Sequence, residues 1–233
     1  MRTTALIVAA GRGTRLQASR PKPFVTLAGR PILERAARAF AAYPRVDGLV
    51  VVAADPGAAQ RLLLAVAPRA VVVRGGAERQ DSVRLGLAVL EGDGVVLVHD
   101  AARPLVEAAV IDAVIEAAER HGAAVPVVRV ADTVKRLRPD GTVAATVPRE
   151  DLALAQTPQG FRIDLLRRAY DRALADGFLG TDDASLVERD GGRVVAVPGS
   201  ERNVKITTPR DLALAEALLR AEGGGEGRDD GGS

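Results

Sequence analysis

The sequence contains no cysteine and no tryptophan, and only two of its 233 residues are histidines. Without cysteine, a disulfide framework, a thiol nucleophile and a cysteine-based zinc site are excluded. With only His99 and His121, an all-histidine metal site is excluded as well. Aromatic residues make up only 3% of the chain, which argues against a base-stacking platform for nucleic acid.

Long apolar runs are also missing, because none reaches the roughly 18 residues of a membrane span. Met1 leads almost directly into a short apolar segment, without the pattern of a signal peptide. The net charge is only +2, and the basic residues are dispersed along the chain. We therefore expect a cytoplasmic protein that binds neither a membrane nor nucleic acid.

Lysine is scarce although basic residues are not, since the 32 basic residues include only Lys22, Lys135 and Lys205 as lysines. Arginine and lysine present different geometries to a phosphate. Retained lysines therefore indicate positions that need a compact ammonium, although chance alone also has to place three residues somewhere.

Apolar runs alternate with helical patterns, as buried parallel strands and their crossover helices do. The expected strands cover residues 5–10, 49–53, 71–73, 95–98, 123–130 and 194–197. The expected helices cover residues 31–42, 82–90, 107–120, 163–176, 183–189 and 209–219, with one more following Pro56. The pattern predicts an α/β fold with a doubly wound, mostly parallel, Rossmann-like sheet in a single domain of residues 1–220. Ligands of such sheets bind beyond the carboxyl ends of the strands.

Residues 132–150 break this alternation. Two short strand patterns flank Asp140-Gly141, a pair typical of a two-residue hairpin turn. Since no helix intervenes, we expect a β-arm that projects from the sheet, and an isolated hairpin needs something to pack on. A second copy of the chain is the natural partner, so we predict a homodimer. The Gly-rich residues 221–233 are expected to form a disordered tail.

A glycine-rich loop follows the first strand. It reads Ala9-Ala10-Gly11-Arg12-Gly13-Thr14-Arg15-Leu16, with Pro21-Lys22-Pro23 shortly after it. Leu16 stands where a dinucleotide fingerprint needs its last glycine, and the Walker A pattern is absent. Backbone N–H groups of such a turn can still approach phosphates, and Arg15 and Lys22 could neutralise a triphosphate. The alternative is an ordinary strand-to-helix turn with surface charges.

A second motif, His99-Asp100-Ala101-Ala102-Arg103-Pro104, follows the fourth strand. A carboxylate at this position is well placed for Mg²⁺, which takes one or two protein carboxylates together with substrate phosphates. Arg103 could reach a phosphate or fix Asp100, and the alternative is that Asp100 only caps the next turn. We interpret His99 as a structural neighbour.

The two motifs together resemble the 2-C-methyl-D-erythritol 4-phosphate cytidylyltransferase family of the non-mevalonate isoprenoid pathway. The first motif is shared with the wider superfamily of nucleotidyltransferases, and the second motif restricts the resemblance to this family. Further matching stretches run in order from residue 3 to about residue 219. They are Gly75–Val83, Asp132–Lys135, Arg149, Gln156–Gln159, Thr181–Ser185 and Asn203–Thr207.

The resemblance implies a role for individual residues. The resemblance implies that Arg15, Lys22 and Lys205 are catalytic groups that contact phosphates. It also implies that Asp100 holds the cofactor Mg²⁺. Around CTP it implies Ala9, Ala10, Gly11, Gly13, Thr14, Gly76, Ser82 and Asp100. The small alcohol phosphate would be held by Arg103, Thr133, Arg149, Thr157 and Thr181, with Thr133 and Arg149 coming from the partner's arm. Ala77 departs from the family, which often carries an acidic residue there.

The resemblance implies the transfer of CMP from CTP to the phosphate of a small alcohol phosphate, with release of pyrophosphate. No general base is needed for this reaction. The second pKa of a phosphate monoester is about 6, so the nucleophile is mostly ionised at neutral pH. The obstacle is the repulsion between two anions, and lysines, an arginine, backbone amides and Mg²⁺ can overcome it.

Three other functions remain open at this point. A ribitol-5-phosphate cytidylyltransferase would share the fold and many motifs, and a sugar-1-phosphate nucleotidylyltransferase would share the first one. A non-catalytic nucleotide-binding regulator is the alternative from another class.

Overall fold

The computed structural model describes residues 1–11, 16 and 20–223, and the predicted site residues Gly13, Thr14 and Arg15 lie outside them. An eight-stranded sheet has the order β10-β7-β11-β6-β1-β4-β5, with β12 paired to β7. Its strands are β1 (Thr3–Ala9), β4 (Gly48–Ala53), β5 (Val71–Arg74), β6 (Val95–Asp100), β7 (Ala123–Arg129), β10 (Ala153–Ala155), β11 (Gln159–Arg162) and β12 (Val195–Pro198). The pairs β1–β4, β1–β6, β4–β5 and β7–β12 are parallel, which confirms the mostly parallel sheet.

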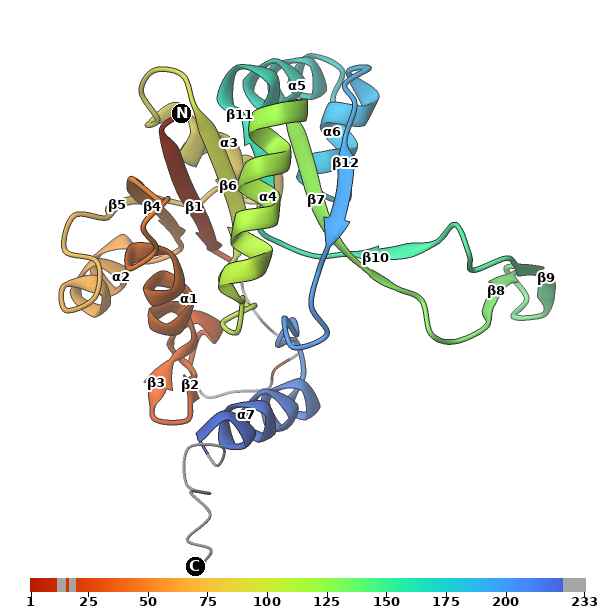
Figure 1. Cartoon of the computed structure of the whole chain (residues 1–233), viewed down its shortest axis with the longest axis horizontal. Helices are drawn as coiled ribbons and strands as arrows, with labels where there is room; N and C mark the ends of the chain where they lie inside the picture. The colour runs from red at the N-terminus through yellow and green to blue at the C-terminus, as the bar shows by residue number, and fades with distance from the viewer. Residues whose placement is uncertain (12–15, 17–19, 224–233) are drawn as a thin grey trace, which may run out of the picture.

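Helices cover both faces of the sheet, because the strands are apolar on both sides. In β1, Ala5 and Ile7 belong to one buried cluster and Leu6 to another. One face is covered by α1 (Ile32–Ala41), α2 (Pro56–Leu63) and α4 (Ala108–His121), and the other by α3 (Arg79–Ala88), α5 (Ile163–Ala175) and α6 (Asp183–Arg189). Figure 1 shows α4 crossing in front of the sheet. The doubly wound fold is therefore confirmed.

The strand order reverses at β1, which decides where a ligand can bind. From β1 the chain adds β4 and then β5 on one side, and it next adds β6 on the other side. The loops after β1 and β6 therefore diverge at the carboxyl edge of the sheet. A crevice at such a reversal is where ligands of open α/β sheets bind.

The central strand β11 was not predicted from the sequence. It is antiparallel to both of its neighbours, β6 and β7. Its four residues include Gly160, where a Cβ atom would come within 2.5 Å of the Val114 side chain of α4. A short segment with glycine at its centre carries no strand signal of its own, so its neighbours specify this strand.

Strands β8 (Val134–Leu137) and β9 (Val143–Val147) form a separate two-stranded sheet. Figure 1 shows this hairpin standing away from the main sheet, at the end of two extended segments. The predicted two-residue turn is wrong, because the Arg138 N–H donates to the Thr142 carbonyl around a three-residue loop. Only Gly141 of that loop has a positive φ, at 84°, whereas a type I′ turn also needs one at Asp140. The Asp140 carboxylate instead accepts hydrogen bonds from the backbone and hydroxyl of Thr142.

The C-terminal helix α7 (Pro209–Gly223) is longer than predicted. Residues 221–223, which the sequence analysis assigned to the tail, are helical, and residues 224–233 lie outside the described part of the chain. Ala215 of α7 packs with Ile206, Leu27 and Ile32 in a third apolar cluster. This cluster joins α7 to the small hairpin of β2 (Thr26–Leu27) and β3 (Arg30–Pro31). Within the described residues, no helix has both the length and the apolar character that crossing a membrane requires.

Candidate functional site

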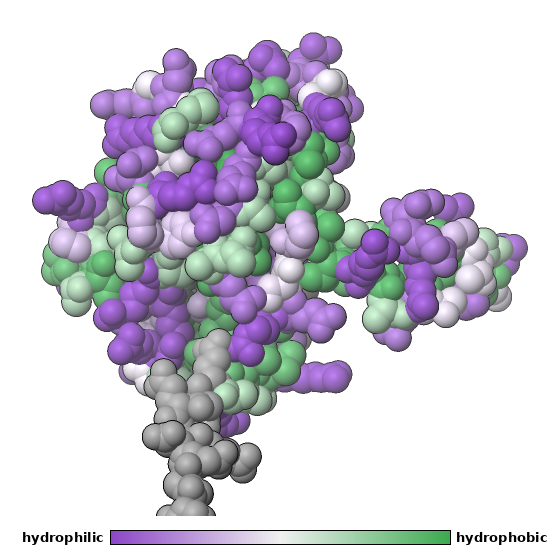
Figure 2. Space-filling model, viewed as in Figure 1, coloured by the Kyte–Doolittle hydropathy of each residue, from purple (hydrophilic) through white to green (hydrophobic). Residues whose placement is uncertain are grey.

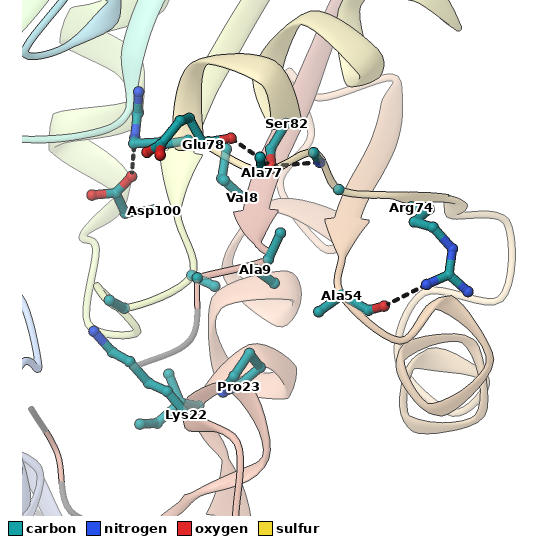
Figure 3. Close-up of a pocket in the computed structure, with 18 of the residues that line it drawn as sticks. Val8, Ala9, Lys22, Pro23, Ala54, Arg74, Ala77, Glu78, Ser82 and Asp100 are labelled. Atoms are coloured by element: carbon teal, nitrogen blue, oxygen red, sulfur yellow. Dashed lines mark hydrogen bonds and ion pairs between the residues drawn. The ribbon is translucent and has the colours of Figure 1, made fainter. Parts of the chain in front are cut away.

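A cavity of about 750 Å³ opens at the carboxyl ends of β1 and β6, at the reversal of the strand order. Many of the predicted site residues line it. These are Ala9, Ala10, Gly11, Lys22, Gly76, Ser82, Asp100 and Lys205. In Figure 3, Lys22 reaches from the short helix η2 (Lys22–Phe24) toward the end of β6, where Asp100 lies.

One wall of the cavity is the loop between β5 and α3, and its shape depends on close packing. A Cβ atom at Gly75 would lie 2.3 Å from the Cβ of Ala10, so only glycine lets this loop lie against the end of β1. The Ser82 hydroxyl accepts a hydrogen bond from Gly76 N–H and donates to the Glu78 carbonyl, both at 3.1 Å. Ser82 is 1% exposed, so its hydroxyl mainly fixes the backbone that a ligand would meet.

Asp100 ends β6 between two cations. Its Oδ1 lies 3.0 Å from Arg79 Nε, and its Oδ2 lies 2.6 Å from Lys205 Nζ. Burial alone would raise the pKa of this carboxyl, but the two cations outweigh burial and hold the pKa well below its usual range. Lys205 is held beside the loop after β6 because Ile206 N–H donates to the Ala102 carbonyl at 2.8 Å. Asp100 is therefore ionised at neutral pH with both oxygens paired.

Arg79 has a second partner, Asp183, at the start of α6. The guanidinium makes two hydrogen bonds to the Asp183 carboxylate, at 3.1 and 2.7 Å, and that side chain is 0% exposed. The hydroxyl of Tyr170 also donates to Asp183, at 2.5 Å. Burial lowers the pKa of Arg79, but Asp183 and Asp100 together raise it above its ordinary value. A single guanidinium thus connects a buried carboxylate to the carboxylate of the cavity.

The two cations at Asp100 are held with different strength. Removing one partner of a buried ion pair typically costs about 3–5 kcal/mol, because an uncompensated buried charge remains. An exposed ion pair typically contributes only about 0–1 kcal/mol. Arg79 belongs to the first class through Asp183, whereas Lys205, with a side chain that is 44% exposed, is closer to the second.

The cavity fits a magnesium ion only together with a ligand that brings its own oxygens. In the described part of the chain, no group of three or more His, Cys, Asp or Glu side chains could hold a metal. Asp100 offers one carboxylate at the cavity wall. Mg²⁺ keeps several waters and uses one or two carboxylates with substrate phosphates, so this donor set suits it.

Behind Asp100, buried groups fix the end of β6. The Asp100 N–H donates to Thr157 Oγ1 at 3.1 Å, and this hydroxyl lies 3.2 Å from His99 Nδ1. His99 Nε2 lies 2.9 Å from the Arg103 carbonyl, which can only accept, so Nε2 carries the proton. Thr157 is 6% exposed, so it lies behind the cavity rather than among the ligands of a substrate. The structure therefore shows Thr157 supporting the end of β6, and its predicted contact with the substrate stays a prediction.

His99 should make the stability of the fold depend on pH. Burial lowers its pKa from 6.5 to about 4, although the bond to the Arg103 carbonyl opposes the shift. Below pH 6.5 the unfolded chain takes up a proton that the folded chain does not accept until about pH 4. We expect this to remove about 3 kcal/mol of unfolding free energy as the pH falls through that interval, at about 1.4 kcal/mol per pKa unit.

Urea unfolding in metal-free buffer between pH 7.5 and pH 4 would measure this loss. His99→Gln is expected to flatten the pH dependence, and replacing the exposed His121 in the same way is expected to leave it unchanged. Equal slopes for the wild-type and His99→Gln chains would show that His99 does not cause the loss.

The remaining predicted substrate ligands lie outside the cavity. The Arg103 guanidinium donates to the backbone carbonyl of Asn203 at 2.7 Å, and its buried Nε has no partner among the described residues. Thr133 and Arg149 are exposed, and each lies where an extended segment joins the hairpin. Arg149 donates to the Ala131 carbonyl beside it. Thr181 is exposed just before α6.

Comparison with known proteins gives the family. The family model for 2-C-methyl-D-erythritol 4-phosphate cytidylyltransferase matches residues 3–221. The chain belongs to this family.

Proteins of this name in two bacteria illustrate how similar the chain is to the family. The one from Acidobacterium capsulatum is 48% identical, with 94% of this chain and 98% of the relative covered. The one from Symbiobacterium thermophilum is also 48% identical, with 94% and 93% covered.

Solved structures of the family are similar in fold to this chain. The crystal structure of the Thermus thermophilus cytidylyltransferase superposes with a TM-score of 0.78 at 40% identity, covering 94% of this chain and all of that one. The Francisella tularensis structure gives 0.81 at 32% identity with the same coverage. The family membership favours the methylerythritol interpretation over the ribitol, sugar-1-phosphate and regulator alternatives.

Sequence reasoning missed the ion pair that links Arg79 to Asp183. Both residues lie in segments that had been matched to the cytidylyltransferase family, yet neither was given a role. The two residues are 104 positions apart, and neither segment by itself indicates the other. In the sequence, the only sign of this pair is that two charged residues without a predicted role lie inside segments that resemble the family.

Proposed function

We propose that the protein transfers CMP from CTP to the phosphate of 2-C-methyl-D-erythritol 4-phosphate, with Mg²⁺ as cofactor. The products are 4-diphosphocytidyl-2-C-methyl-D-erythritol and pyrophosphate. The observation that carries the proposal is the convergence of Lys22, Lys205 and Asp100 in one cavity at the reversal of the strand order. The choice of alcohol phosphate and of the cytidylyl group as the transferred group follows the names of the relatives.

The cytidine is proposed to lie between the end of β1 and the loop after β5. Ala9, Ala10 and Gly76 offer backbone there without side chains that would block a base or ribose. Ser82 holds the loop in this shape through the hydrogen bond that its hydroxyl accepts from Gly76 N–H. The triphosphate then extends past Gly11 toward Lys22 and Lys205.

In the reaction, an oxygen of the alcohol's phosphate attacks the α-phosphorus of CTP. A new P–O bond forms, the bond from the α-phosphorus to the bridging oxygen breaks, and pyrophosphate leaves with the electron pair. No proton has to move, because the attacking phosphate is already ionised. Lys22 and Lys205 counter the repulsion between the anions and stabilise charge on the α-phosphate and the leaving group.

Magnesium, when bound with the nucleotide, would neutralise phosphate charge beside Asp100. Asp100 would hold it, since its carboxylate is ionised at the cavity wall. Gly13, Thr14 and Arg15, which lie outside the described residues, are proposed to contact the triphosphate, and Arg103 and Thr181 are proposed to contact the alcohol phosphate. A cytoplasmic location stays a prediction.

The functional unit is proposed to be a homodimer in which Thr133 and Arg149 reach the partner's cavity. The hairpin of β8 and β9 pairs with no other strand of the described chain. Its apolar residues Leu137 and Val143 are 61% and 53% exposed, and Leu154 of neighbouring β10 is 58% exposed. Figure 2 shows apolar surface continuing from the body onto the start of the arm. A partner subunit would cover these side chains.

Pyrophosphate release tests the proposed reaction. With CTP and Mg²⁺, we expect release on adding 2-C-methyl-D-erythritol 4-phosphate and none when Mg²⁺ is omitted. Release only with ribitol 5-phosphate would show that the same site acts on a different alcohol phosphate. Release with UTP, GTP or dTTP in place of CTP would indicate a different nucleotide. Binding of CTP without any release would support the non-catalytic regulator.

A further inference from the structure

We infer that Lys205 is an exchangeable counter-ion of Asp100 that keeps a metal ion from binding there until the nucleotide arrives. Arg79, in contrast, is a fixed counter-ion. The inference rests on the proposed function only in taking a divalent cation and a nucleotide triphosphate as ligands of the cavity. It concerns the step at which Asp100 becomes able to bind the metal ion, and which of its two carboxylate oxygens binds it.

Both oxygens of Asp100 are paired with cations. Lys205 Nζ lies 2.6 Å from Oδ2, and Arg79 Nε lies 3.0 Å from Oδ1. A metal ion placed against either oxygen would meet a positive charge already in contact with it. One of the two cations therefore has to leave before Asp100 can bind a metal.

Arg79 is the cation that stays. Two of its hydrogen bonds go to Asp183, whose side chain is 0% exposed and also accepts from Tyr170. Moving the guanidinium away would leave a buried carboxylate without its cation, which is strongly unfavourable.

Lys205 is the cation that leaves. Its side chain is 44% exposed, and its ammonium meets Asp100 on the cavity side of the carboxylate. A lysine is a compact charge on a flexible stem, so it can turn to another anion without a large rearrangement. The triphosphate is such an anion. Its arrival would draw Lys205 away and free Oδ2 for the metal that accompanies it.

The charge balance agrees with this order of events. Among the ion-paired side chains, Asp100 and Asp183 contribute two negative charges, and Arg79 and Lys205 contribute two positive charges, so the cluster of these four groups is neutral. Arg103, which also interacts electrostatically with Asp100, adds a further positive charge beside them. A divalent cation therefore gains little by approaching the cluster alone. Without Lys205, the same cluster would carry one negative charge and a vacant Oδ2.

Titration of Mn²⁺, with the free ion measured by electron paramagnetic resonance and no nucleotide present, tests the inference. We expect Lys205→Gln to bind Mn²⁺ about tenfold or more tightly than the wild-type chain, since a contacting charge shifts ionic equilibria by one or more powers of ten. Lys205→Arg keeps the charge and is expected to bind as weakly as the wild type. Asp100→Asn added to Lys205→Gln should remove the gain.

Equal Mn²⁺ affinity of the wild-type and Lys205→Gln chains would overturn the inference, and so would a gain that survives Asp100→Asn. For the fixed cation, Asp183→Asn should lower the urea midpoint or prevent folding, whereas Lys205→Gln should shift the midpoint much less. An unchanged midpoint in Asp183→Asn would contradict the fixed role of Arg79. These measurements use no substrate, so they can succeed or fail independently of pyrophosphate release.

Discussion

Replacing either lysine of the cavity, in Lys22→Ala or Lys205→Ala, is expected to lower turnover by about 10²–10³-fold, the usual loss for one preorganised charge donor. Both lysines lie on the cavity wall where two anions have to meet. Their charge matters most when the attacking phosphate and the α-phosphate share a crowded transition state. The loss should therefore appear mainly in kcat rather than in KM for CTP.

Steady-state pyrophosphate release over a range of CTP concentrations measures this loss. Arg120→Ala is a matched control, because Arg120 is an exposed cation in the last turn of α4, whose first turn follows the loop after β6. That last turn lies at the edge of the sheet opposite the cavity, so turnover should stay near the wild-type value. If both lysine variants kept wild-type turnover, the assignment of the cavity as the active site would be wrong.

Activity is also expected to return when two inactive chains are combined, one carrying Arg149→Ala and the other Lys22→Ala. If the arm acts on the partner's cavity, the mixed dimer has one cavity with an intact Lys22 and an intact Arg149. Its other cavity lacks both. The mixed dimer should then show about half of the wild-type turnover per dimer, since one of its two sites is complete.

Co-expression with two different affinity tags isolates this mixed dimer without depending on subunit exchange. Each pure variant, purified in the same way, supplies the baseline. A mixed dimer with no more activity than the baselines would show that Arg149 serves its own subunit. Failure to recover any doubly tagged species, with single tags purified normally, would contradict the homodimer.

The sequence by itself determined the parallel core of the fold and the residues at its edge. Runs such as residues 49–53 and 95–98 carry their own strand signal, because strands buried on both faces are apolar throughout. Lys22 and Asp100 were found because each belongs to a short motif with a recognisable chemistry, and Lys205 was found because its segment resembles one of the family's. Hydrophobic periodicity and motif spacing are local properties, so they can be read from one stretch of chain at a time.

The tertiary structure decided which of these residues meet and with what partners. Strand β11 exists only because β6 and β7 bond to both of its edges. The turn at Gly141 took three residues because the Asp140 side chain bonds to Thr142. The pairing of Arg79 with Asp183 depends on contacts between distant segments. Because of this pairing, Arg79 is fixed more firmly beside Asp100 than Lys205 is. Burial and partner choice arise only when those segments pack together, because the free energy of a buried charge depends on its surroundings and not on its neighbours in sequence.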